Sequence, residues 1–356
     1  MSDDWMEREF EHEQVTVFRD PGTGLTGAIA IHSTALGPAV GGLRLFRYPT
    51  LSAAVVDALR LARAMSFKNA AAGLDLGGGK AVLVDDGEWP GRREQRMRAF
   101  GAAVERLGGS YVTAEDVGTT PDDMDVISGL TDHVAGRATD RGGRGDPSPY
   151  TARTVVGAIE SAVRLRGGAS GLDGVTVGVQ GVGHVGVHLV RLLRDRGARV
   201  CVTDLDPGRA ADVADRYGAT VLPLENFALG DFDVFAPCAL GGAIGAEHLD
   251  RLRAPIVAGA ANNPLADRRL AAELRDRGTV YVPDFLANCG GIIHVGAEVL
   301  GLSDAQVEEL IAQAIARTGE VLEEASALGA VPVDLAEERA AERLQRARSV
   351  ARPAYG

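Results

Sequence analysis

The chain has 356 residues, of which 46% are hydrophobic and 24% charged, and its formal net charge is −12. This composition predicts a globular protein of two domains, and the acidic balance argues against nucleic acid as a partner. No apolar run reaches the roughly eighteen residues of a membrane-spanning helix. Three widely separated cysteines are typical of reduced thiols in a cytoplasmic protein and form no zinc motif.

The first part of the chain is predicted to mix strands and helices around a turn at 20–22. The expected elements are strands at 15–18 and 28–31, a helix over 51–66, a strand at 81–84, a helix over 94–107 and a strand at 110–113. We expect the first helix to bury an apolar stripe that includes Leu51 and Val55, and to end just before Lys68.

Lys68 and Lys80 are the only lysines among the 37 residues that are lysine or arginine, and both lie in the segment KNAAAGLDLGGGK. Unlike arginine, a buried lysine can lose its proton and act as a base. Lys80 also ends a run of three glycines, where the backbone can approach a ligand closely. This setting favours a chemical role for the two lysines over an accident of composition.

Beyond a linker rich in glycine, arginine and proline at 136–149, strands and helices alternate. The expected elements are a strand at 175–179, a helix over 184–196, strands at 199–203, 234–235, 256–257 and 280–282, a long helix from Ser303 and a last helix after Pro332. Such alternation predicts an α/β fold with a parallel sheet covered by helices on both faces.

A glycine-rich turn follows the strand at 175–179 and opens the next helix. Its residues are Gly181, Val182, Gly183, His184, Val185 and Gly186, in the pattern GxGxxG. The glycines permit a tight turn, and the N–H groups of the helix start attract a pyrophosphate. Asp204, at the end of the following strand, can bind the adenosine ribose, and with Asp206 it repels a 2′-phosphate. The pattern therefore predicts NAD rather than NADP.

Seven motifs appear in order along the chain. They are GPAVGG at 37–42, MSFKNAAAGLDLGGGKAV at 65–82, TAEDVGT at 113–119, GDPSPYTA at 145–152, APCALGG at 236–242, GAANN at 259–263 and PDFLANCGG at 283–291. By these motifs the chain resembles the amino-acid dehydrogenase family that includes the leucine, valine and phenylalanine dehydrogenases, with glutamate dehydrogenase more distant. The resemblance implies two α/β domains with a cleft between them: a substrate and oligomerisation domain over 1–148, to which 331–356 returns, and a Rossmann domain over 149–330.

The resemblance also implies roles for single residues. Lys80 corresponds to the catalytic lysine, Asp116 to the catalytic aspartate, and Lys68 to the lysine that binds the substrate α-carboxylate. Oxidative deamination takes a hydride from Cα, and water attacks the resulting iminium. Lys80 with a lowered pKa can activate that water, while Asp116 moves protons to and from the amine nitrogen. A purely structural Lys–Asp salt bridge is the competing interpretation, which the neighbouring motifs disfavour.

Further positions follow from the same resemblance. Gly41 and Gly42 are implied to line the substrate site. Thr151 corresponds to the cofactor-facing threonine, and Asn262, or its neighbour Asn263, to a residue that contacts cofactor and substrate.

The side-chain pocket is implied to be lined by Val40, Ala114, Ile292 and Val295. All four are apolar and none offers a cation to a γ-carboxylate, which disfavours glutamate as the substrate. The run Ile293-His294 resembles the corresponding run of the phenylalanine-type members and favours an aromatic substrate. We expect leucine or valine as the substrate, with phenylalanine or another aromatic amino acid as the alternative.

Two other functions compete with this reading. A catalytically inactive NAD-binding or sensing protein would not need both lysines and Asp116, and a 2-hydroxy-acid dehydrogenase would need a His–carboxylate pair that we do not find. We therefore predict an NAD-dependent enzyme that acts on an L-amino acid, its 2-oxo acid and ammonia. We expect no metal, no membrane or nucleic-acid partner, and a homo-oligomer.

Overall fold

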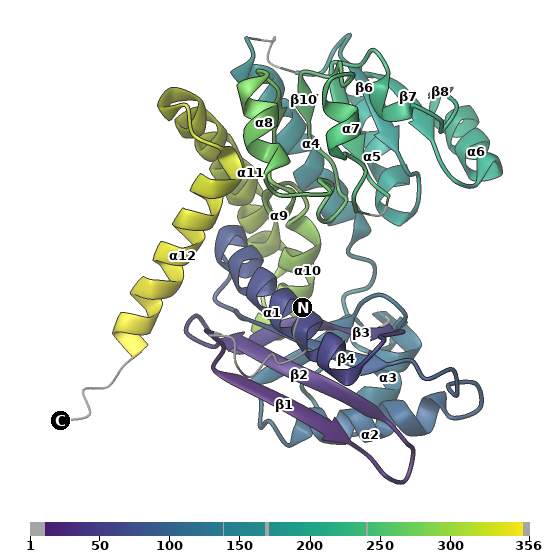
Figure 1. The fold of residues 1–356 in the computed structure, drawn as a ribbon, viewed down its shortest axis with the longest axis vertical. Helices are drawn as coiled ribbons and strands as arrows, with labels where there is room; N and C mark the ends of the chain where they lie inside the picture. The colour runs from purple at the N-terminus through teal and green to yellow at the C-terminus, as the bar shows by residue number, and fades with distance from the viewer. Residues whose placement is uncertain (1–10, 138, 168–170, 240, 352–356) are drawn as a thin grey trace. The chain divides into compact units, whose positions relative to one another are not determined.

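A computed structural model of the chain describes residues 11–137, 139–167, 171–239 and 241–351 (Figure 1). Residues 1–10 and 352–356, which belong to the predicted first domain, lie outside the described residues, as does Leu240 of the APCALGG motif. The chain divides into two compact units. Unit 1 comprises Met1–Asp146, His294–Ser303 and Ala340–Gly356, and unit 2 comprises Pro147–Ile293 and Asp304–Arg339.

The division falls at different places from the predicted domain boundaries. It assigns His294–Ser303 to unit 1, although the sequence suggested the Rossmann domain for this segment. Towards the C-terminus it falls at Ala340, within the last helix α12 (Pro332–Ala351), rather than before that helix. It also falls within α10 (Gly290–Leu300), between Ile293 and His294.

Unit 1 is built on a five-stranded mixed sheet with the strand order β1-β2-β4-β3-β5. The elements of its N-terminal segment are β1 (Gln14–Arg19), β2 (Thr26–Ser33), β3 (Ala39–Phe46), α1 (Leu51–Ala72), β4 (Gly77–Val84), α2 (Arg93–Glu105), β5 (Tyr111–Glu115), α3 (Pro121–Ser128) and the 3₁₀ helix η2 (Thr139–Arg141). The predicted hairpin of β1 and β2 is confirmed as an antiparallel pair, and β3 pairs in parallel with both β4 and β5.

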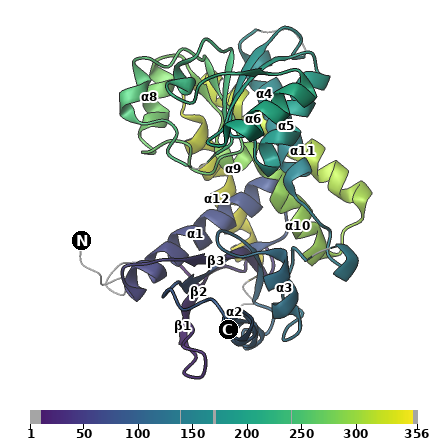
Figure 2. The ribbon, with the colours of Figure 1, turned by 90° about the vertical axis from the view of Figure 1, so that its right-hand side faces the viewer.

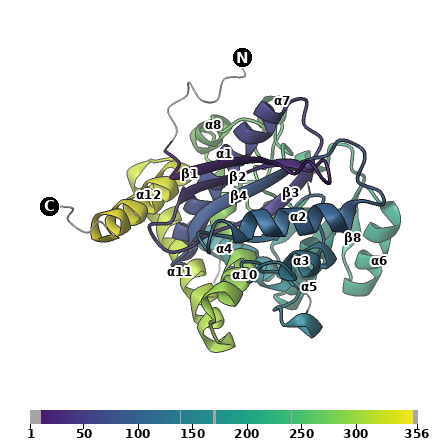
Figure 3. The ribbon, with the colours of Figure 1, turned by 90° about the horizontal axis from the view of Figure 1, so that it is seen from below.

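Helix α1 covers one face of this sheet, and α2 and α3 cover the other (Figures 2 and 3). The helix side of the α1 interface consists of small residues. They are Ala54, Val55, Ala58 and Ala62. The predicted stripe is therefore wrong in part, since Leu51 is 38% exposed. Small side chains allow the helix backbone to pack close to the sheet, and the leucines are left towards the edges of the contact.

Two predicted boundaries near the lysines are wrong. Helix α1 continues to Ala72, so Lys68 lies inside it, and β4 begins at Gly77, so Lys80 lies inside a strand. The glycine run forms a strand because it is packed too tightly for side chains. An added Cβ at Gly78 would lie 2.1 Å from the backbone nitrogen of Ser66 in α1. Both lysines are thus held by regular secondary structure rather than by loops.

Unit 2 contains a six-stranded sheet in the order β11-β10-β9-β6-β7-β8, in which neighbouring strands pair in parallel. Its elements are α4 (Ser148–Leu165), β6 (Thr176–Gln180), α5 (His184–Asp195), β7 (Arg199–Thr203), α6 (Pro207–Tyr217), β8 (Thr220–Val221), the 3₁₀ helix η3 (Phe227–Leu229), β9 (Val234–Pro237), α7 (Ala246–Leu249), β10 (Ile256–Val257), α8 (Leu270–Asp276), β11 (Val280–Tyr281), α9 (Asp284–Ala287) and α11 (Asp304–Leu328). This order is the doubly wound arrangement of the Rossmann fold, which confirms the predicted parallel sheet.

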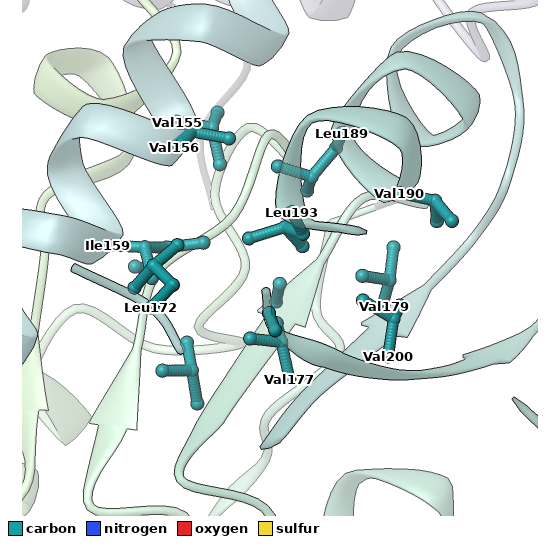
Figure 4. Packing of buried hydrophobic residues seen from close by; sticks show 14 of the residues in the cluster. Val155, Val156, Ile159, Leu172, Val177, Val179, Leu189, Val190, Leu193 and Val200 are labelled. Carbon is teal, nitrogen blue, oxygen red and sulfur yellow. The ribbon is translucent and has the colours of Figure 1, made fainter. Parts of the chain in front are cut away.

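Each face of the second sheet has its own apolar core. On one face, α4 and α5 pack against β6 and β7 through aliphatic side chains (Figure 4). The labelled residues of this core include Ile159, Val177, Leu189 and Leu193. The other core contains aromatic and aliphatic residues from η3, β9, α7 and α8. Helices cover both faces of the sheet, and the strand order reverses between β6 and β9. Sheets of this kind bind ligands at the carboxyl ends of the strands at such a point.

Candidate active site and dinucleotide site

Lys80 and Asp116 meet in unit 1, as the resemblance implied. The Lys80 Nζ lies 2.9 Å from the Oδ2 of Asp116, and Lys80 as a residue is only 5% exposed. The same oxygen accepts a hydrogen bond from the Nε of Arg44 at 3.0 Å. The Asp116 side chain is 24% exposed, so the carboxylate stands between a buried amine and the surface.

The alternation of side chains along neighbouring strands produces this meeting. Gly42 on β3 is paired with Ala114 on β5, and Leu43 with Ala81 on β4, so Gly42 and Lys80 share the sheet face that α1 covers. Asp116 follows β5 directly. The absence of a side chain at Gly42 keeps the space around the amine free. A Cβ there would lie 2.7 Å from the Cβ of Asp116 and 3.3 Å from the Lys80 Nζ.

Burial and charge shift the pKa values of the pair. Burial lowers the pKa of Lys80, although the opposite charge of Asp116 works against this shift. For Asp116, burial acts to raise the pKa, but the charges of Lys80 and Arg44 outweigh it and hold the pKa below its ordinary value. The site therefore holds an ionised carboxylate beside an amine that gives up its proton more readily than a free lysine.

Arg44 is a site residue that the sequence analysis missed. Besides Asp116, its Nη1 donates to the Oδ2 of Asp57 in α1 at 3.2 Å, and the Tyr48 hydroxyl donates to the same Asp57 oxygen at 2.7 Å. The signal was present in the sequence, because Arg44 stands two residues after Gly42 on a strand and therefore points to the same face.

Lys68 lies on α1, the helix that covers the Lys80 face of the sheet, and its side chain is half-buried. Its neighbours anchor this part of the helix. The Ser66 hydroxyl is 2.8 Å from the Nδ1 of His32, and the Asn69 side chain donates to the carbonyl of Gly77 at 2.5 Å. These bonds join the Lys68 segment of the helix to β2 and to the glycine run that precedes Lys80.

The pocket candidates fall into two groups. Val40 on β3 and Ala114 on β5 are buried in unit 1, 1% and 7% exposed. Val295 also belongs to unit 1, whereas Ile292 belongs to unit 2. The helix that carries Val295 is tied to the linker, because the carboxylate of Glu298 accepts hydrogen bonds from the backbone N–H groups of Gly136 and Arg144 at 3.2 and 3.3 Å.

The other glycines and histidines of the site have structural explanations. Gly41 lies on β3, where an added Cβ would come 1.7 Å from the carbonyl oxygen of Gly79. His294 is 3% exposed, its Nε2 is 3.0 Å from the carbonyl of Arg144, and burial lowers its pKa. His184 is the exposed first residue of α5.

The glycine-rich turn of unit 2 has the predicted geometry. It joins β6 to α5, and Gly181 adopts a φ of +98° that favours glycine. A Cβ at Gly186 would lie 2.1 Å from the carbonyl oxygen of Gly181, so close packing requires this glycine. At Gly183 an added Cβ would meet no atom within 4 Å, and no side chain caps α5. The open space beside uncapped N–H groups fits a pyrophosphate.

Asp204 follows β7 and is bonded to the turn. Its Oδ2 accepts a hydrogen bond from the N–H of Val182 at 2.8 Å, and its Oδ1 accepts one from the N–H of Asp206 at 2.9 Å. Arg209 lies 3.5 Å from Asp204 and 3.7 Å from Asp206. The guanidinium charge is therefore shared between two carboxylates, which leaves no excess positive charge for a 2′-phosphate and suits NAD.

The remaining cofactor candidates also lie in unit 2. Thr151 is in the first turn of α4, with its hydroxyl 3.3 Å from the carbonyl of Pro147. Asn262 and Asn263 follow β10 and are both exposed. The Oδ1 of Asn262 accepts a hydrogen bond from the side chain of Asn288 at 2.9 Å, whereas Asn263 has a φ of +49°. The Asn262 side chain is therefore oriented by Asn288.

Two classes of site are not found in the part of the chain that the structure describes. No group of three or more His, Cys, Asp or Glu residues there could hold a metal ion. Within the same residues, no helix has the length and apolar character needed to cross a membrane.

Comparison with known proteins identifies the family. The Glu/Leu/Phe/Val dehydrogenase dimerisation-domain model matches residues 12–133, and the Glutamate/Leucine/Phenylalanine/Valine dehydrogenase model matches residues 208–350. The chain belongs to the Glu/Leu/Phe/Val dehydrogenase family. It is therefore an amino-acid dehydrogenase, an oxidoreductase that uses NAD, and the two-domain fold predicted from its motifs is confirmed.

Individual relatives match almost the whole chain. It is 41% identical to a leucine dehydrogenase of Bacillus subtilis, over 97% of this chain and 95% of that protein. It is 42% identical to a valine dehydrogenase of Streptomyces albus, over 95% of this chain and 93% of that protein. Among solved structures, the L-tryptophan dehydrogenase of Nostoc punctiforme matches with a TM-score of 0.83 and 35% identity, covering 95% of this chain and 97% of that one.

Proposed function

We propose that this dehydrogenase catalyses the reversible oxidative deamination of a branched-chain aliphatic L-amino acid, leucine or valine, to its 2-oxo acid and ammonia. The observation that carries the proposal is the buried amine of Lys80, 2.9 Å from a carboxylate oxygen of Asp116, in a chain of the amino-acid dehydrogenase family. Bound NAD supplies the hydride acceptor, and the turn at 181–186 with Asp204 would hold it in unit 2.

In this proposal each residue of unit 1 has one task. Lys68 binds the substrate α-carboxylate through its positive charge. Asp116, ionised because its pKa is lowered, takes the proton that the substrate ammonium must lose before hydride can leave Cα. Lys80, whose burial lowers its pKa, then removes a proton from the water that attacks the iminium carbon. In the reverse direction the same two groups return these protons.

The proposed site residues support an aliphatic substrate. Val40, Ala114, Ile292 and Val295 are all apolar, and a γ-carboxylate in such surroundings would remain without a partner. The leucine and valine dehydrogenases among the relatives, at 41% and 42% identity, favour the same class. The likeness to a tryptophan dehydrogenase favours an aromatic amino acid as the second candidate.

We also propose that the chain forms a homo-oligomer in the cytoplasm. The family model matched by residues 12–133 is described as a dimerisation domain. A matching solved structure, the glutamate dehydrogenase of Thermus thermophilus at 25% identity and a TM-score of 0.78, is described as a hetero-hexamer. The three cysteines are free thiols, as expected in a reducing compartment.

The test follows NADH absorbance at 340 nm with ammonia and three 2-oxo acids: 4-methyl-2-oxopentanoate, 3-methyl-2-oxobutanoate and phenylpyruvate. We expect the first two to be reduced with a kcat/KM at least about tenfold above phenylpyruvate, a difference of about 1.4 kcal/mol. A preference for phenylpyruvate or for the oxo acid of tryptophan would replace the aliphatic proposal by the aromatic one. A lower Kd for NADPH than for NADH would contradict the cofactor assignment.

A further inference from the structure

Arg44 joins the Lys80–Asp116 pair to a second acidic group. Its Nε lies 3.0 Å from Asp116 and its Nη1 lies 3.2 Å from Asp57, and its own side chain is only 21% exposed. Asp57 is held in turn by the hydroxyl of Tyr48 at 2.7 Å and by Arg60 at 2.8 Å. The guanidinium is thus fixed at both ends, by β5 and by α1, and has little freedom to leave Asp116.

The two oxygens of the Asp116 carboxylate differ in their surroundings. Oδ2 receives both cations, the Nζ of Lys80 and the Nε of Arg44. Both contacts, at 2.9 and 3.0 Å, are therefore made with the same oxygen of the carboxylate. Two cations on one oxygen favour a single orientation of the carboxylate, in which Oδ2 faces the cations. A carboxylate with a single cation could rotate and place either oxygen against it.

We propose that Arg44 is a positioning residue for deamination: by occupying Oδ2 together with Lys80, it directs Oδ1 of Asp116 towards the substrate nitrogen and prevents Asp116 from holding the Lys80 amine in its protonated form. This inference rests on the proposed function, because it assigns Arg44 a task in that reaction. Arg44 contacts Asp116 directly, and it is linked to Lys80 through the Oδ2 of Asp116.

The charges around the pair determine the direction in which each neighbour shifts the pKa of Lys80. Lys80 faces Asp116 after β5, Arg44 on β3 and Asp57 on α1, while Tyr48 and Arg60 reach it only through Asp57. Arg44 acts to lower the pKa of Lys80, and Asp57 acts to raise it. Removal of Arg44 must therefore move the Lys80 pKa upwards, whereas removal of the Asp57 charge must move it downwards. Loss of packing alone would not produce opposite shifts from two neighbours in one network.

The chain offers a direct measurement of this shift. Because Lys68 and Lys80 are its only lysines, protein labelled with ¹³Cε-lysine should give two lysine signals, which a Lys68→Arg variant assigns. We expect the Lys80 signal to titrate about one pH unit higher in Arg44→Gln than in the wild type, and lower than the wild type in Asp57→Asn. Arg60→Gln is the matched control, since Arg60 is 57% exposed and forms an ion pair with Asp57 rather than with Lys80 or Asp116, and it should leave the Lys80 titration unchanged.

Kinetics of the same variants test the positioning role. In the deamination direction, the rise of kcat/KM with pH should move alkaline in Arg44→Gln by the same amount as the Lys80 titration. Its kcat at the new optimum should still fall about tenfold or more, because Oδ1 is no longer directed. Arg44→Lys retains the positive charge, but an ammonium group cannot contact Asp57 and Asp116 as a planar guanidinium does. It should therefore retain the wild-type pH dependence of kcat/KM but not the wild-type kcat.

These outcomes separate the inference from the proposed function. An unchanged Lys80 titration in Arg44→Gln overturns the inference, whether or not the enzyme turns over. If the Lys80 titration shifts in Arg44→Gln but kcat stays unchanged, the positioning role is overturned. If the wild-type protein shows no ammonia-dependent turnover, the proposed function fails, and the titration still decides whether Arg44 controls the charge of Lys80.

Discussion

The sharpest prediction concerns replacement of Lys80 by methionine, which keeps a long side chain and removes the charge. General-base catalysis typically contributes a factor of about 10² to 10⁴ in rate. We therefore expect kcat for deamination to fall by that factor, which corresponds to a barrier higher by about 3–5 kcal/mol. NADH binding should persist, because the glycine turn and Asp204 lie in unit 2, whereas Lys80 lies in unit 1.

The same variant should remain folded, for a reason that the structure provides. Removal of one partner of a buried ion pair is harmful when the other is left without compensation. Here Asp116 is 24% exposed and keeps the Nε of Arg44 at 3.0 Å, while the buried amine of Lys80 no longer has to be desolvated. We expect the free energy of unfolding to change by less than about 1 kcal/mol, a Tm change within about 2–4 °C.

A second buried cation provides the matched control for Lys80→Met. Arg96 is 1% exposed and pairs with Asp86 at 2.7 Å, and it lies in α2, on the opposite face of the sheet from Lys80. Arg96→Met should lower stability by about 1–3 kcal/mol and leave kcat unchanged. Steady-state assays at 340 nm and thermal unfolding of both variants decide the matter. A kcat of Lys80→Met within tenfold of the wild type would refute the role of Lys80.

Three further predictions address the two units and the pH dependence of stability. Gly183→Ala should leave Tm unchanged but raise the Kd for NADH at least about tenfold, since its methyl group has room in the fold and enters the pyrophosphate space; tight NADH binding would contradict this. Gly41→Ala should lower the free energy of unfolding by about 1–3 kcal/mol or more, because its Cβ would collide with the Gly79 carbonyl 1.7 Å away; an unchanged urea midpoint would count against the packing described here. His32 is 2% exposed, and burial together with nearby cations lowers its pKa to about 3, so the unfolded chain takes up a proton below about pH 6.5 that the folded protein does not. Stability should therefore fall from pH 6.5 towards pH 3, by up to about 1.4 kcal/mol per pH unit, and His32→Gln should reduce this slope; equal slopes would exclude His32 as a cause.

Local patterns in the sequence were sufficient for most of unit 2. The strands at 199–203 and 256–257 have the predicted limits, and the turn at 181–186 lies between a strand and a helix as its glycines indicated. Buried parallel strands are short apolar runs separated by turn residues, so they are visible without tertiary information. The meeting of Lys80 with Asp116 came from resemblance to a family, because residues 36 positions apart are joined only by the register of β4, β3 and β5.

Tertiary packing explains what the sequence patterns did not predict. The run Gly77 to Gly79 resembles a loop, but it forms a strand because α1, β2 and β5 approach it more closely than side chains would allow. For the same reason α1 buries alanines where leucines were expected. Arg44 escaped notice because its position two residues after Gly42 indicates only the sheet face that it shares, whereas its partners are Asp116, after β5, and Asp57, on α1.

The central claim is that the chain transfers hydride between NADH and an iminium formed from ammonia and an aliphatic 2-oxo acid. It is tested most directly by NADH oxidation with 4-methyl-2-oxopentanoate, measured with and without ammonium chloride on the same purified protein. We predict steady turnover that depends on ammonia and saturates with the oxo acid, at a kcat on the order of 1–10³ s⁻¹. NADH oxidation that proceeds equally without ammonia, or none with any 2-oxo acid, would contradict the claim.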